Sequence, residues 1–169
     1  LMAQQGMPTF AGSDLITDVD SVREAAQRIG FPLVVKPTGG GGGMGMQVVE
    51  HMADLETALA QAQAVADAAF ANGGLYLERW IEKPRHIEYQ ILADEQGNAM
   101  HLFERECSVQ RRHQKLIEES PAPGIDTTVL REQAQRGADI CAQLGYNNLG
   151  TMETLYSDGD SGFLEMNTR

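Results

Sequence analysis

The chain has 169 residues, 42% of them hydrophobic and 22% charged, and its formal net charge at pH 7 is −11. This length suffices for a buried core, and the acidic balance argues against a general binder of nucleic acid or anionic membranes. No stretch is apolar for long enough to predict a membrane span, and the start, LMAQQGMPTF, lacks the basic and apolar regions of a signal peptide.

Two cysteines, Cys107 and Cys141, lie 34 residues apart and do not have the spacing of a zinc site. Cys141 falls on the apolar face of a predicted helix, and Cys107 has no base beside it in sequence, so we expect both to be structural. Free cysteines of this kind favour a reducing, cytoplasmic compartment, or the mitochondrial matrix in a eukaryote.

The first half of the chain predicts two helices and several short strands. Residues 21–24, SVRE, form a capping-box pattern that opens a helix ending at Gly30. A β-branched strand at residues 33–35 delivers Lys36 at its end, and residues 46–49 are predicted to be a return strand. An amphipathic helix is expected over residues 54–70 and a strand over residues 75–81.

The second half is richer in predicted strands. Residues 87–93 and 99–103 are expected to be strands joined by a polar turn, whereas residues 106–124 lack periodicity and contain the breaker sequence PAP. Thr127 or Thr128 is expected to cap a third helix, whose apolar face carries Leu130, Ala134, Ala138, Cys141 and Leu144. Because hairpins are more evident than βαβ units, we predict an α+β fold with antiparallel sheets.

Lys36 precedes a run of five glycines, Gly39, Gly40, Gly41, Gly42 and Gly43. Backbone N–H groups without side chains can close over phosphate oxygens, and a lysine adds a positive charge. A strand, not a helix, is predicted to follow the glycines, which excludes a dinucleotide-binding fingerprint. A P-loop is also excluded, because no Lys-Ser or Lys-Thr ends the run. We favour a phosphate lid over a simple flexible linker.

A basic cluster lies further along the chain. Four of the thirteen basic residues, Arg105, Arg111, Arg112 and Lys115, fall within eleven positions. In an acidic protein this favours a small anionic ligand; the alternatives are a solvated loop or a nucleic-acid patch, and no interleaved aromatic residues support the latter. His86 is interpreted as either a polar contact or an ordinary surface histidine.

The last twenty residues, 150–169, are predicted to form a β-hairpin that turns at residues 157–160, SDGD. This register places Glu153 opposite Glu165, with Asn167 and Arg169 on the same face. The other face is expected to carry Met152, Thr154, Leu164 and Met166. Facing carboxylates repel unless a cation lies between them, although a solvated acidic face is the commoner fate of hairpin glutamates. Together with the glycine loop and the basic cluster upstream, the pair favours a Mg²⁺ or Mn²⁺ site.

Five segments together resemble the biotin carboxylase family of ATP-grasp enzymes: GGGGGMGM (39–46), PRHIEYQ (84–90), ERECSVQRRHQK (104–115), EESPAPG (118–124) and EMNTR (165–169). The resemblance extends from about Gly6 to the last residue. It implies a partial ATP-grasp fold: residues 1–12 end a preceding subdomain, residues 13–80 form the lid subdomain and residues 81–169 begin the large subdomain. Carbamoyl phosphate synthetase shares the acidic hairpin but lacks the segment from QRRHQK to PAPG.

The resemblance also implies roles for individual residues. Catalytic roles with bicarbonate and carboxyphosphate fall on Lys115 and Arg169, and metal ligation falls on Glu153, Glu165 and Asn167. ATP contacts are implied for the lysine and glycines above and for Glu78, Ile81, His86, Gln110 and His113. Met44 departs from the family, which usually has a basic residue there, so one lid charge is missing.

The implied reaction is the ATP- and bicarbonate-dependent carboxylation of carrier-bound biotin, through carboxyphosphate, by an ATP-dependent ligase. Its partners would be a biotin carboxyl carrier domain and a carboxyltransferase component, within a homo-oligomer, and not nucleic acid or a membrane. Because the family extends beyond both ends, we expect an internal fragment that does not turn over alone. The alternatives are another ATP-grasp ligase, such as a carbamoyl phosphate synthetase-like enzyme, and a non-catalytic nucleotide-binding module.

Overall fold

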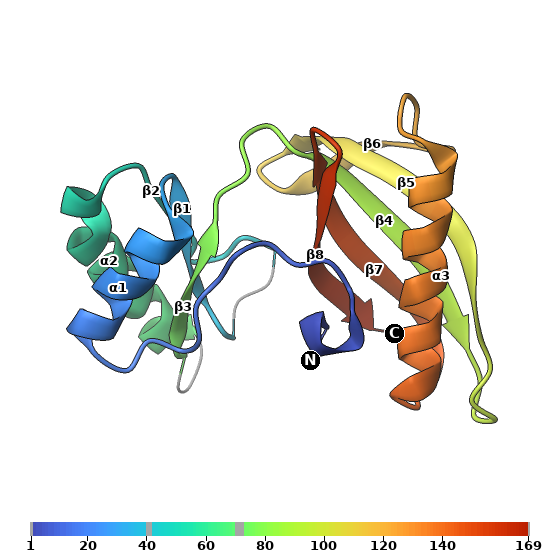
Figure 1. Cartoon of the computed structure of the whole chain (residues 1–169), viewed down its shortest axis with the longest axis horizontal. Helices are drawn as coiled ribbons and strands as arrows, with labels where there is room; N and C mark the ends of the chain where they lie inside the picture. Colours follow the sequence, from blue (N-terminus) through green and yellow to red (C-terminus); the bar gives the residue numbers. More distant parts are fainter. Residues whose placement is uncertain (1, 40–41, 70–72, 169) are drawn as a thin grey trace. The chain divides into compact units, whose positions relative to one another are not determined.

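The computed structural model describes residues 2–39, 42–69 and 73–168 (Figure 1). The chain forms two compact units: residues 10–82 make one, and residues 1–9 with residues 83–169 make the other. Each contains an antiparallel sheet and at least one helix, so the predicted α+β class is confirmed. Among the helices of the described residues, none is long and apolar enough to cross a membrane.

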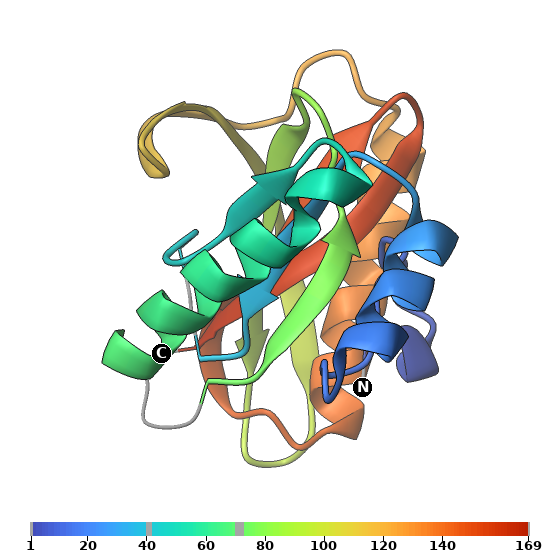
Figure 2. The same ribbon diagram turned by 90° about the vertical axis from the view of Figure 1, so that its left-hand side faces the viewer.

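The unit of residues 10–82 contains α1 (Val19–Ile29), β1 (Leu33–Pro37), β2 (Gln47–Val49), the short 3₁₀ helix η2 (Met52–Asp54), α2 (Leu55–Ala69) and β3 (Leu75–Arg79). The strand order is β2-β1-β3, antiparallel throughout. Leu33, Val35 and Leu77 point from the strands into one core with the apolar stripes of α1 and α2. Both helices therefore cover the same face of this sheet (Figure 2).

Two helices, α1 and the third helix of residues 127–143, are capped by aspartates, and the caps predicted for them are wrong. The Asp18 carboxylate accepts a hydrogen bond of 2.8 Å from the Ser21 backbone N–H, so α1 starts before the expected capping box. Asp126 likewise accepts from the Thr128 backbone N–H at 2.8 Å and caps the third helix. A carboxylate both accepts this bond and interacts favourably with the positive end of the helix dipole.

The glycine run joins β1 to β2, as predicted, although Gly40 and Gly41 lie outside the described residues. Gly42, Gly43 and Gly45 have φ values of 59°, 81° and 77°, a region that L residues rarely adopt. A Cβ on Gly45 would also lie 2.9 Å from Pro37 Cγ. At these positions glycine is required by the course of the backbone.

The second unit contains the 3₁₀ helix η1 (Ala3–Gln5), β4 (Arg85–Ala93), β5 (Ala99–Arg111), β6 (Gln114–Glu119), α3 (Thr127–Gln143), β7 (Asn148–Ser157) and β8 (Asp160–Thr168). Its antiparallel sheet has the order β6-β5-β4-β7-β8, and α3 covers one face (Figure 1). Ile87, Tyr89, Ile91 and Met152 share a buried core with α3. Leu144, predicted to join that core, is 47% exposed because α3 ends at Gln143.

No strand was predicted within residues 106–124, but the structure has strands there as far as Glu119, and only the PAP segment that follows is irregular. β5 continues to Arg111 and pairs with β6, with Gln110 opposite Lys115. The turn between them is made by Arg112 and His113, whose φ values are 51° and 64°. Tight hairpin turns of this kind usually carry Asn or Gly, and two register shifts interrupt the strand alternation, so the hairpin has no clear sequence signal.

The β7–β8 hairpin has the predicted register, with Glu153 opposite Glu165 and Thr151 opposite Asn167. A bulge follows, since Thr154 pairs with Phe163 and leaves Leu164 as the extra residue. Phe163, and not the predicted Leu164, therefore packs against the core with Met166.

Candidate active site

A row of charged residues crosses the five-stranded sheet of the second unit. Glu88 on β4 is opposite Arg105 on β5 and opposite Glu153 on β7, which in turn is opposite Glu165 on β8. Because the neighbouring residues Ile87 and Met152 point into the α3 core, this row lies on the other face of the sheet. Three glutamates thus stand side by side on adjacent strands.

Lys115 provides the counter-charge for two of these glutamates. Its Nζ donates to Glu88 Oε2 and to Glu153 Oε1, both at 2.5 Å. The two carboxylates are 1% and 5% exposed, so without this ammonium they would face each other in a poorly solvated place. Burial alone would lower the pKa of Lys115, but the hydrogen bonds to both glutamates outweigh burial and raise it.

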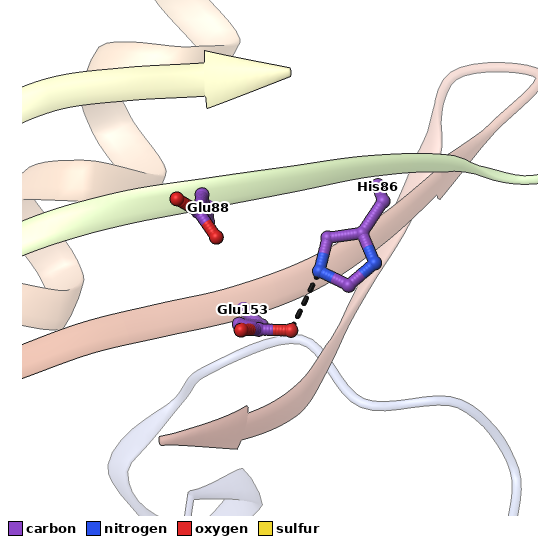
Figure 3. A group of neighbouring side chains, drawn as sticks. All are labelled: His86, Glu88 and Glu153. Carbon is purple, nitrogen blue, oxygen red and sulfur yellow. Dashed lines mark ion pairs between the residues drawn. The ribbon is translucent and has the colours of Figure 1, made fainter. Parts of the chain in front are cut away.

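Each oxygen of Glu153 has its own contacts. Oε1 also accepts a hydrogen bond of 2.5 Å from the Asn167 amide. Oε2 lies 2.6 Å from His86 Nε2, although this ion-pair contact lacks the alignment of a hydrogen bond (Figure 3). Burial would raise the pKa of Glu153, but the contacts with His86 and Lys115 lower it to about 2. The carboxylate is therefore fully ionised at neutral pH.

His86 is oriented by Gln110. The amide nitrogen of Gln110 donates to the Cys107 carbonyl at 2.8 Å and lies 3.0 Å from His86 Nδ1. These contacts orient the imidazole ring so that Nδ1 lies beside Gln110 and Nε2 faces Glu153. The structure thus brings five of the predicted site residues into direct contact: His86, Gln110, Lys115, Glu153 and Asn167.

Glu88 has a second cationic partner, which sequence reasoning missed. Arg105 forms an ion pair with Glu88 Oε1 and another, of 2.5 Å, with Glu118. Polar residues alternate along β4, with Glu88 and Gln90 on the face of His86, and this alternation was a usable signal. Their partners on β5 and β7 could not be read from the sequence, because strand pairing between distant segments has no local pattern.

The donor set fits a divalent cation. Carboxylate and amide oxygens are the ligands that Mg²⁺ and Mn²⁺ prefer, and Glu153, Glu165 and Asn167 lie together on β7 and β8. Lys115 already occupies one cationic position beside Glu153. Asn167 presents its amide nitrogen to Glu153, and a half-turn of the amide would present its oxygen instead. Within the described residues, the Glu165 carboxylate, on a strand paired with β7, makes no hydrogen bond or ion pair through its side chain.

The remaining predicted residues belong to the unit of residues 10–82, to the turn between β5 and β6, or to the residues outside the described ones. In the unit of residues 10–82, Lys36 Nζ is 3.1 Å from Glu78 Oε1, and Ile81 follows β3. In the other unit, His113 is exposed in the turn between β5 and β6. Arg169 lies outside the described residues. Cys107 and Cys141 are free and buried, and burial raises the pKa of the Cys107 thiol to about 12, as expected of a structural cysteine.

Sequence comparison places the chain among known proteins. The family model described as the carbamoyl-phosphate synthase L chain, ATP binding domain, matches residues 1–169. The biotin carboxylase of Haemophilus influenzae is 49% identical and that of Allochromatium vinosum 51% identical, each over 99% of this chain. The biotin carboxylase of Pseudomonas aeruginosa is 46% identical, also over 99% of this chain. The chain spans 38% of the length of each of these three relatives.

Solved structures agree with these relatives. The biotin carboxylase of Campylobacter jejuni, in a beta-gamma-ATP complex, matches with a TM-score of 0.94 and 43% identity over 99% of this chain and 38% of that one. The biotin carboxylase domain dimer of Hydrogenobacter thermophilus 2-oxoglutarate carboxylase, with MgADP, ADP and bicarbonate, matches with a TM-score of 0.93 and 39% identity, with the same coverage. The fold is thus part of an ATP-grasp fold, and the resemblance to biotin carboxylases is confirmed. The chain belongs to the family of carbamoyl-phosphate synthase L-chain ATP-binding domains.

Proposed function

We propose that the full-length protein carrying this chain is the biotin carboxylase component of a biotin-dependent carboxylase, an ATP-dependent ligase. One observation carries the proposal: a lysine ammonium is shared by two buried carboxylates, on the sheet face that also presents Glu165 and Asn167. Such a face can offer a cation site and an anion site side by side. The identity of 49–51% to the biotin carboxylases of two bacteria supports the same conclusion.

We propose ATP contacts for the following residues. Lys36, 12% exposed and paired with Glu78, would contact phosphates, and the glycine loop of residues 39–43 would cover them. Glu78 and Ile81 would meet the adenine. His86, Gln110 and His113 would lie along the ribose and phosphates. The nucleotide complexes of the Campylobacter and Hydrogenobacter proteins support nucleotide binding by the full-length protein.

Glu153, Glu165 and Asn167 would hold the divalent cation, Mg²⁺ or Mn²⁺. When bound, that cation would neutralise phosphate charge and polarise the transferred phosphoryl group. Glu153 is ionised throughout the physiological pH range, because its pKa is lowered to about 2, and it therefore needs no deprotonation to bind a cation. MgADP in the Hydrogenobacter structure supports magnesium.

Lys115 would orient bicarbonate. It would also stabilise the charge that develops as an oxygen of bicarbonate attacks the γ-phosphorus of ATP. That attack forms carboxyphosphate and releases ADP. Carboxyphosphate would then deliver its carboxyl group to a ring nitrogen of biotin, with loss of phosphate and of the nitrogen's proton. Arg169 would be a second cation for the bicarbonate or the carboxyphosphate. Fixed ammonium and guanidinium groups suit this task, because negative charge accumulates between two anions.

The partners follow from the reaction. Biotin would arrive on a carboxyl carrier domain, and a carboxyltransferase component would choose the final acceptor. A homo-oligomer is proposed by analogy with the Hydrogenobacter domain dimer.

Two free, buried cysteines are compatible with a reducing compartment such as the cytoplasm.

The test is substrate dependence of ATP hydrolysis by the full-length protein. A biotin carboxylase hydrolyses ATP only when bicarbonate is present, and free biotin stimulates it. Stimulation by ammonia, with no response to biotin, would instead identify a carbamoyl phosphate synthetase-like enzyme. Nucleotide binding with no hydrolysis under any condition would identify a binding module.

A further inference from the structure

The two carboxylates that share Lys115 differ in what else holds them. Glu153 lies between Lys115, His86 and Asn167, on the side of the cluster that includes Glu165. Glu88 lies on the opposite side, where Arg105 pairs with its Oε1 while Lys115 binds its Oε2. Glu153 thus faces the proposed cation ligands, and Glu88 faces the basic residues of β5 and β6.

This difference matters when a cation arrives. Lys115 Nζ and the Asn167 amide both donate to Oε1 of Glu153. A divalent cation on Glu153 repels the ammonium and competes with it for that carboxylate. If Glu153 were the only anion beside Lys115, cation binding would leave a partly buried ammonium, 23% exposed, without its counter-ion.

Resting on the proposed function, we propose that Glu88 is a positioning residue that keeps the Lys115 ammonium in place while Glu153 binds the cation. Three observations support it. Glu88 is 1% exposed, its Oε2 is 2.5 Å from Lys115 Nζ, and Arg105 holds its other oxygen. Among the described residues, no carboxylate besides these two contacts Lys115. Glu88 itself needs no contact with the cation, ATP or bicarbonate.

The test measures the chemical accessibility of Lys115 in the full-length protein, with Mn²⁺ as the cation. Lys115 is modified with an amine-reactive reagent, and the rate is followed by mass spectrometry of its peptide. Exposed Lys83 is the internal standard for the reagent. Electron paramagnetic resonance of free Mn²⁺ reports site occupancy in the same samples.

The unchanged protein should protect Lys115 both with and without Mn²⁺. Glu88→Gln should protect it nearly as well without Mn²⁺, since Glu153 still holds it, but saturating Mn²⁺ should raise the modification rate about tenfold, as expected for loss of a charge-assisted hydrogen bond. Glu119→Gln, which removes an exposed carboxylate on the same strand as Lys115, should behave like the unchanged protein.

Several results would overturn the proposal. If the modification rate of Lys115 in Glu88→Gln is raised equally with and without Mn²⁺, the role of Glu88 is merely structural. If Lys115 in this variant stays protected at saturating Mn²⁺, Glu88 does not have the proposed role. Loss of Mn²⁺ binding in Glu88→Gln would mean that Glu88 is itself a cation ligand. If the unchanged protein does not bind Mn²⁺, no cation competes with Lys115 for Glu153, and the proposal fails. If Glu88→Gln does not fold, Glu88→Asp gives the same comparison with a shortened side chain. No nucleotide, bicarbonate or biotin is present, so this result is independent of whether the protein carboxylates biotin.

Discussion

Replacing Lys115 by methionine removes the ammonium between two buried carboxylates. Oxygens of Glu88 and Glu153 lie within 4.8 Å of each other. Coulomb's law at an effective dielectric constant of 20 gives a repulsion of about 3 kcal/mol at this separation. Removing one partner of a buried ion pair typically costs about 3–5 kcal/mol, which is the same magnitude. We therefore expect Lys115→Met to lower the free energy of unfolding of the β4–β8 unit by about 3 kcal/mol at pH 7.

Hydrogen exchange in urea measures this effect, because peptides from β4 and β7 report on that unit alone. Trp80 fluorescence reports on the unit of residues 10–82 and should not change. Lys83→Met, at an exposed lysine, is the matched control and should be neutral. Saturating Mn²⁺ should recover part of the loss, since it supplies the missing positive charge. A loss below about 0.5 kcal/mol, the range of ordinary surface substitutions, would refute the shared-ammonium interpretation.

Three further predictions concern the same sheet. Glu165→Gln in the full-length protein should abolish metal-dependent turnover but leave binding of an ATP analogue intact; equal loss of both would mean a structural carboxylate. The pKa of Glu153 in the folded protein, about 2, is below its ordinary value of 4.5, so ionised Glu153 contributes about 3 kcal/mol to the free energy of unfolding. This contribution is complete above pH 4.5 and is lost as the pH falls towards 2. Urea titrations from pH 7 to pH 3 should show this slope, and Glu153→Gln should flatten it. Gly150→Ala would place a Cβ 2.7 Å from the Tyr146 hydroxyl and against Met166, which should cost about 2 kcal/mol in thermal unfolding; a neutral substitution would mean that the strand relaxes freely.

Local sequence patterns predicted the parts of the site that are close in sequence. The turn at residues 157–160 and the alternation around it correctly placed Glu153 opposite Glu165. Both segments belong to one hairpin, so a short turn determines which residues meet. The bulge at Leu164 was not predicted, because one extra residue changes the pairing without changing the composition of the strand.

Long-range pairings could not be predicted in this way. Glu88 meets Glu153 because β4 lies next to β7, some sixty residues away, and meets Arg105 because β4 lies next to β5. The β5–β6 hairpin, which brings Lys115 to the cluster, turns on Arg112 and His113. The tertiary structure imposes left-handed backbone on residues that do not favour it. The shared ammonium is therefore a property of the fold.

Transfer of labelled bicarbonate to biotin tests the central claim most directly. With ATP and Mg²⁺, the full-length protein should form labelled carboxybiotin, and formation should require ATP. Glu153→Gln should abolish the product, and the chain of 169 residues alone should not form it. Nucleotide binding by a folded, full-length protein that forms no carboxybiotin would contradict the account.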